Sequence, residues 1–100
     1  MKYNKLIRDK IPEIIRAKGR EPIIHIADQQ EYWQKLKEKL VEEFKEFEAA
    51  ESPEELADVL EVIDAIIKYK NFDFIEIKKI KEQKAQARGK FEKRIILDES

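Results

Sequence analysis

The sequence predicts a mainly α protein, an antiparallel helical bundle. Only two Gly and three Pro occur in 100 residues, so most of the chain lacks residues that break helices. Apolar residues recur at spacings of three and four over long stretches, and N-cap residues precede these stretches. Because 42% hydrophobic residues supply one modest core at this length, we expect a single domain over residues 1–100.

The first helix is predicted at residues 10–18. Asp9 can serve as its N-cap, and Pro12 falls in the first turn, where its missing N–H costs little. Gly19 suits the position after the last turn, because glycine adopts the left-handed conformation there without strain. The punctuation on both sides therefore frames a short helix.

Two short apolar runs with β-branched residues follow a different pattern. They lie at residues 22–27 and 91–97, and each is too short for a helix. We expect them to pair as a short two-stranded β element. His25, the only histidine, lies in the first run. We expect it to be a hydrogen-bonded structural residue, since one histidine cannot build a histidine metal site.

Two longer helices are predicted at residues 29–50 and 53–70. Asp28 and Ser52 each precede a Glu by three positions, which is the pattern of a capping box. The short turn between the two helices forces them to lie side by side and antiparallel. A fourth helix is predicted to begin after Asp73 and to end near the second glycine.

Composition excludes several classes of protein. The chain has 21 Lys+Arg against 22 Asp+Glu, a net charge of −1, so bulk charge implies no affinity for nucleic acid. The absence of cysteine excludes disulfides, thiolate metal sites and a cysteine nucleophile. Charged residues interrupt every apolar stretch before it could span a membrane, and no signal peptide is apparent. We expect a cytoplasmic protein.

Charge is nevertheless sorted along the chain. Residues 2–20 carry seven Lys/Arg against two acids, residues 31–64 carry four Lys against twelve acids, and residues 78–94 carry eight Lys/Arg against two acids. This pattern is compatible with the ordinary electrostatics of a helical bundle. It is also compatible with a site where carboxylates bind a cation and basic side chains bind phosphates.

The position of Glu43 favours the second interpretation. It follows Leu40 by three positions and precedes Phe47 by four, so it projects from the apolar stripe of its helix. An unpaired buried charge is costly, so Glu43 requires a basic partner, a metal ion or a water-filled pocket. If the hairpin turns between Ala50 and Glu51, equal rise on both helices brings Glu43 level with Asp58.

By the same argument Glu46 lies level with Glu55. Four carboxylates then converge within two helical turns, which is reasonable only if a positive charge lies between them. Carboxylate oxygens suit a hard cation, Mg²⁺ or alternatively Mn²⁺. Three of these residues also have structural explanations, because Glu55 belongs to a capping box and Glu46 and Asp58 can face water. A hairpin shifted by one turn would substitute Glu61 and Asp64 for the second pair.

The carboxylate pattern resembles a known family. Glu43-x-x-Glu46 and Glu55-x-x-Asp58 resemble the E-x-x-E and E-x-x-D motifs of the all-α nucleoside-triphosphate pyrophosphatases, the MazG-like and phosphoribosyl-ATP pyrophosphohydrolase-like superfamily. The segments 3–12 and 88–97, YNKLIRDKIP and RGKFEKRIIL, look like the two ends of a small single-domain branch of it. The resemblance therefore covers nearly the whole chain.

The resemblance implies an activity and a set of site residues. It implies Mg²⁺ bound by Glu43, Glu46, Glu55 and Asp58, and hydrolysis of a nucleotide triphosphate to the monophosphate and pyrophosphate. Glu43 or Glu46 would act as the catalytic base that accepts the proton of the attacking water. The matched end segments suggest the phosphate-binding residues: Lys5, Arg8, Lys10, Lys84, Arg88, Lys93 and Arg94. The identity of the nucleotide is not implied.

One feature departs from the family pattern. Eight residues separate Glu46 from Glu55, which is fewer than usual, whereas Glu61-x-x-Asp64 would give a gap of fourteen. We retain Glu55 and Asp58 because they lie level with the first pair. Aromatic residues such as Trp33 and Tyr69 could stack on a base, although aromatics at helical spacing usually belong to the core.

Two alternatives to an enzyme are considered. A non-catalytic helical interaction module would explain the helices but not Glu43. A nucleic-acid-binding protein would use the basic residues 78–94, although no nucleic-acid partner is expected from the net charge. We also expect a homo-oligomer, because the helix at 53–70 is apolar on most of its circumference and needs more cover than this chain provides. The resemblance points to a dimer or a tetramer of dimers.

Overall fold

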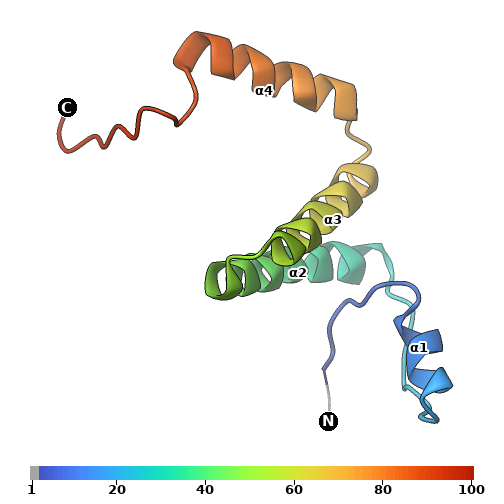
Figure 1. Cartoon of the computed structure of the whole chain (residues 1–100). Helices are drawn as coiled ribbons and strands as arrows, with labels where there is room; N and C mark the ends of the chain where they lie inside the picture. Colours follow the sequence, from blue (N-terminus) through green and yellow to red (C-terminus); the bar gives the residue numbers. More distant parts are fainter. Residues whose placement is uncertain (1–2) are drawn as a thin grey trace.

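The computed structural model describes residues 3–100, and this part of the chain contains helices but no β-strand. The helices, shown in Figure 1, are α1 (Ile11–Ala17), α2 (Gln29–Ala50), α3 (Pro53–Tyr69) and α4 (Phe74–Arg88). The prediction of a mainly α fold is therefore confirmed. The order and approximate bounds of all four predicted helices are also confirmed.

The predicted β pairing of residues 22–27 with 91–97 is wrong. The two segments lie at opposite ends of the molecule, one between α1 and α2 and the other beyond α4 (Figure 1). Their apolar side chains reach solvent, as the exposed fractions of Ile23 (101%) and Phe91 (98%) show. A single short segment has no backbone partner for a ladder, so neither run forms a strand.

The helix termini follow the capping signals with one exception. The side chains of Asp28 and Ser52 accept hydrogen bonds from the backbone N–H of Glu31 and Glu55, as the capping boxes predict. The expected Asp9 cap is wrong: α1 begins after Lys10, which makes no side-chain cap, and its first N–H donates to the carbonyl of Arg8. A backbone turn has taken the place of a side-chain cap.

Helices α2 and α3 form an antiparallel hairpin that holds the small core. Glu51 adopts the left-handed conformation (φ 52°) between them, which reverses the chain within two residues. Leu36 on α2 (1% exposed) and Val62 on α3 are the buried apolar residues of the described chain. The α3 stripe that contains Val62 therefore faces α2, and the stronger stripe of Leu56, Leu60 and Ile63 does not.

The hairpin has two distinct sides. Phe44 follows the buried Glu43 on α2, and Ile63 follows the buried Val62 on α3. Each side chain is therefore rotated about 100° from its buried neighbour, in the same sense about its own helix axis. Because the helices are antiparallel, this places both residues on one side of the hairpin. We call this side the apolar face; it comprises Val41, Phe44, Leu56, Leu60 and Ile63, all 37–56% exposed. Glu42 directly precedes Glu43, and Glu61 directly precedes Val62, so both lie on the opposite side of the hairpin. We call this side the carboxylate face.

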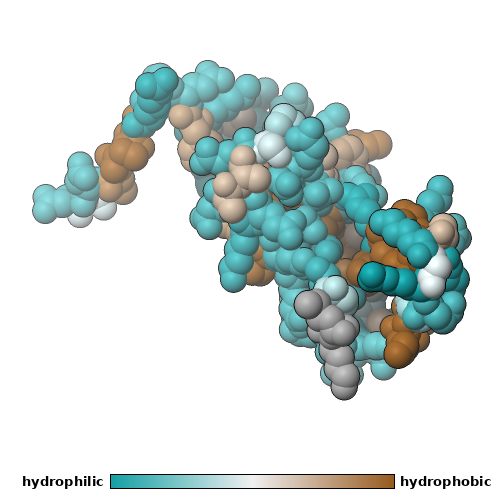
Figure 2. Space-filling view, turned by 60° about the horizontal axis from the view of Figure 1, so that its bottom comes forward, coloured by the Kyte–Doolittle hydropathy of each residue, from teal (hydrophilic) through white to brown (hydrophobic). Residues whose placement is uncertain are grey.

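The position of α4 gives the molecule an extended shape. It buries no residue, and Figure 1 shows it running away from the hairpin. The radius of gyration is 18.0 Å, against about 13 Å for a compact domain of this length. Beyond α4 the tail projects from the body, as Figure 2 shows. Its apolar residues Ile95, Ile96 and Leu97 are 76–80% exposed. No helix among residues 3–100 is long and apolar enough to cross a bilayer.

Candidate metal centre

The site is built around Glu43, which lies in the middle of α2. Only 7% of this residue is exposed, and one carboxylate oxygen, Oε1, lies 3.2 Å from Lys39 Nζ one turn earlier. The other oxygen, Oε2, is buried and accepts no hydrogen bond from residues 3–100. An acceptor buried without a partner costs free energy, so this oxygen could accept a hydrogen bond or coordinate a cation.

Two carboxylates from α3 face Glu43. Glu55, Asp58 and Glu43 each offer a carboxylate oxygen, and the three oxygens lie within 4.8 Å of one another. Glu43 and Asp58 therefore do lie at the same height of the hairpin, as equal helical rise predicts. Lys39 and Arg8 each offset part of this negative charge, at Glu43 Oε1 and Asp58 Oδ1, but neither contacts Glu43 Oε2. An all-oxygen donor set with a buried unpartnered atom fits Mg²⁺ or Mn²⁺.

Glu46, the fourth predicted ligand, lies at the edge of this group. It is exposed and is not among the three carboxylates whose oxygens converge. The negative charge of Glu43 raises the pKa of Glu46, and Glu42 and Glu55 act in the same direction. Because Glu46 lies outside the converging group, it is less committed to cation binding than the other three carboxylates and could accept a proton.

The N-terminal segment brings two cations to the carboxylate face. Arg8 Nη2 lies 2.7 Å from Asp58 Oδ1, and Lys5 Nζ lies 2.9 Å from Glu42 Oε1. Lys35 Nζ donates to the carbonyl of Asn4 over 2.8 Å, which ties the same segment to α2. Lys5 and Arg8, two of the predicted phosphate-binding residues, therefore border the carboxylates. Lys10 lies two residues further along, at the start of α1.

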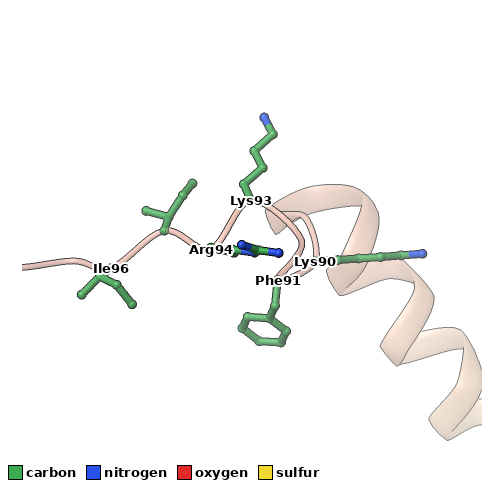
Figure 3. Close-up of a pocket in the computed structure, with 6 residues that line it drawn as sticks. Lys90, Phe91, Lys93, Arg94 and Ile96 are labelled. Carbon is green, nitrogen blue, oxygen red and sulfur yellow. The ribbon is translucent and has the colours of Figure 1, made fainter.

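The four C-terminal phosphate-binding candidates lie elsewhere in this chain. Lys84 and Arg88 are on α4, and Lys93 and Arg94 are in the tail beyond it, away from the hairpin (Figure 1). A cavity of 300 Å³ lies in this tail. Figure 3 shows that the side chains of Lys90 and Lys93 there point in different directions. The structure thus brings Lys5 and Arg8 to the carboxylates, and it does not bring the C-terminal residues to them.

The alternative pair, Glu61 and Asp64, has a different location. Both residues line a second cavity of 490 Å³ with Asp9 and Tyr32, further along the carboxylate face. Sequence reasoning missed Asp9 as a lining residue and treated it only as a helix cap. No local signal could have revealed this role, because the position of Asp9 depends on the tertiary contacts of Lys5 and Arg8.

The Lys5–Glu42 pair predicts a pH-dependent contribution to stability. Burial opposes ionisation of Glu42, but the hydrogen bond from Lys5 and the charge of Lys39 lower its pKa overall, while the same hydrogen bond raises the pKa of Lys5. The contribution is therefore present above the ordinary pKa of Glu42 and is lost as the pH falls through its lowered value. It is also lost when the pH rises through the raised pKa of Lys5.

We expect Lys5→Met to lower the free energy of unfolding by about 0.2–1 kcal/mol at neutral pH and to have no such effect at about pH 2. Urea unfolding at both pH values measures the difference. Lys45→Met is the matched control, because Lys45 is exposed on the same helix as Glu42 and forms no ion pair within residues 3–100. An equal loss of stability at both pH values would show that Lys5 acts through packing alone.

Comparison with known proteins gives one partial match. No family model matches the chain, and no solved structure matches it. An uncharacterized protein of Mycolicibacterium smegmatis is 53% identical over 45 residues. The matched region covers 45% of this chain and 46% of that protein, so it spans about half the length of each. The comparison therefore indicates a relative but assigns no activity.

Proposed function

We propose that the protein is a Mg²⁺-dependent hydrolase that converts a nucleoside triphosphate to the monophosphate and pyrophosphate. The observation that carries the proposal is the buried oxygen of Glu43, which has no hydrogen-bond partner in the described part of the chain and lies beside two further carboxylates. Burial of such a group needs compensation, and a divalent cation provides it. The resemblance of the two carboxylate motifs and both chain ends to the pyrophosphatase family supports the same activity.

Each residue of the site has a proposed role. Glu43, Glu55 and Asp58 would hold the metal ion, with Glu46 completing the set from the edge. When bound, Mg²⁺ supplies positive charge that offsets the charge developing on the leaving pyrophosphate and favours ionisation of water. Glu46 is our choice for the general base, because its side chain is exposed at the edge of the three converging carboxylates and is not fully committed to the metal ion.

Basic residues at the rim would bind the phosphates. Lys5 and Arg8 already lie beside the carboxylates, and their ion pairs with Glu42 and Asp58 hold them in position before substrate arrives. The Arg8 guanidinium can form two parallel hydrogen bonds to phosphate oxygens, which adds orientation to charge. The remaining candidates would contribute only where the C-terminal region of the same or another chain reaches the site.

We further propose that the active form is a homodimer. The apolar face presents Val41, Phe44, Leu56, Leu60 and Ile63 to solvent, and α4 leaves this face uncovered. Two hairpins that meet through this face would form a four-helix arrangement with two-fold symmetry. The carboxylate face points the other way on each hairpin and stays accessible to substrate.

A screen for pyrophosphate release tests the proposed activity. The folded protein is incubated with each common ribo- and deoxyribonucleoside triphosphate, with Mg²⁺ or with a chelator, and the monophosphate and pyrophosphate are quantified. We expect equal amounts of both products from at least one triphosphate, and only with Mg²⁺. No release from any triphosphate, with the fold verified by circular dichroism, would favour a non-catalytic interaction module that uses the apolar face.

A further inference from the structure

The second cavity lies directly beside the candidate metal centre. Glu61 and Asp64 follow Asp58 by three and six positions, which corresponds to about 4.5 and 9 Å along the axis of α3. Asp9, which also lines the cavity, is adjacent in sequence to Arg8, whose guanidinium contacts Asp58. The 490 Å³ cavity is within the size range of ligand sites. A molecule bound at the metal centre would therefore extend into it.

Aromatic side chains form a fixed wall at the far end of this cavity. Tyr32 and Tyr69 both line it and meet edge to face, with ring centroids 5.4 Å apart. Trp33, which is not among the lining residues, stacks on Tyr69 with an interplanar angle of 4°. The Tyr69 hydroxyl donates to the backbone carbonyl of Gln29 over 3.1 Å. The two tyrosines are thus held in place without a ligand, and both contribute aromatic surface to the lining of the cavity.

The charge of the cavity excludes phosphate as its occupant. Asp9, Glu61 and Asp64 contribute three carboxylates, against the single cation of Lys68. Phosphate groups would be repelled here, whereas Arg8 and Lys5 attract them at the neighbouring centre. A nucleotide would therefore bind with its phosphates at the metal centre and its base between the tyrosines and carboxylates.

The carboxylates also restrict the base. An ionised carboxylate only accepts hydrogen bonds, so it pairs with an exocyclic amino group and is repelled by a carbonyl oxygen at the same position. We propose that this cavity selects nucleotides whose base carries an exocyclic amino group, such as cytosine, over their oxo counterparts, such as uracil. This inference rests on the proposed function only for the orientation of the nucleotide, since base binding itself needs neither metal nor hydrolysis.

Cytidine and uridine form the test pair, because their bases differ in an amino group against a carbonyl oxygen. Each nucleoside is titrated into the ¹⁵N-labelled protein without metal, and amide shifts are followed by NMR. We expect cytidine to shift residues around Tyr32 and Tyr69 and to bind roughly tenfold more tightly than uridine. Asp64→Asn and Glu61→Gln should reduce this preference, since an amide also donates hydrogen bonds. Glu48→Gln, on the exposed side of α2, is the matched control.

Equal binding of both nucleosides, or no shift from either, would overturn the inference. Tyr32→Leu separates the role of the aromatic side chains from that of the carboxylates, because it should weaken the binding of cytidine and of uridine equally. The outcome is independent of catalysis. Nucleoside preference without pyrophosphate release would refute the proposed hydrolysis alone, and release at equal rates from CTP and UTP would refute the base preference alone.

Discussion

Glu43→Gln is expected to reduce Mg²⁺-dependent pyrophosphate release by about 100-fold or more, since even residues that only support a metal ligand contribute 10–100-fold. The same substitution should leave the apo protein equally or more stable. It removes one charge from three neighbouring carboxylates, the amide occupies the same space, and Lys39 keeps its ion pair with Glu42 when the pair with Glu43 is lost. The diagnostic pattern is an equal or higher melting temperature without metal, together with a smaller shift on addition of Mg²⁺.

Asp58→Asn should behave in the same way, and Glu48→Gln serves as the control because Glu48 is exposed on the same helix as Glu43. Activity and thermal unfolding are measured on the same preparations. Near-wild-type turnover in Glu43→Gln would contradict the assignment of the metal centre. Near-wild-type turnover in Asp58→Asn alone would instead make Glu61 and Asp64 the replacement ligands.

Leu60→Arg is expected to convert the proposed dimer to a monomer. Leu60 lies within the apolar face and is 56% exposed in the single chain. In a two-fold interface each substitution occurs twice, so two unpaired guanidinium groups would be placed in an apolar contact. Light scattering should give a mass of twice 12.0 kDa for the wild type and close to 12.0 kDa for the variant.

Ile23→Arg is the matched control for this experiment. Ile23 is a fully exposed apolar residue outside the hairpin, so the same change of chemistry should leave the mass unchanged. A wild-type mass near 12.0 kDa at micromolar concentration, with or without Mg²⁺, would rule out the dimer. An unchanged dimer in Leu60→Arg would show that a different surface joins the two chains.

The hairpin was predictable because its determinants are local. Capping at Asp28 and Ser52 depends on residues three positions apart, and the height of Glu43 relative to Asp58 follows from helical rise and a short turn. The position of a carboxylate within an apolar stripe was equally visible. These features require no knowledge of contacts between distant parts of the chain.

The features that were not predictable depend on tertiary contacts. The side of α3 that faces α2 is set by Glu55, Asp58 and Val62 rather than by the stronger apolar stripe, so hydrophobicity alone points to the wrong side. The route of the N-terminal segment depends on the ion pair between Arg8 and Asp58, fifty residues apart. The C-terminal tail has β-strand composition but no strand beside it, and composition cannot supply a partner.

Direct measurement of metal binding tests the central claim, that Glu43, Glu55 and Asp58 form a divalent cation site. Mn²⁺ is titrated into the full chain without nucleotide, and free Mn²⁺ is quantified by electron paramagnetic resonance. We expect one saturable site per chain in the wild type and in Glu48→Gln, displaced by excess Mg²⁺ and lost in Glu43→Gln. Equal Mn²⁺ binding by the wild type and Glu43→Gln, or no saturable binding by the folded wild type, would contradict it.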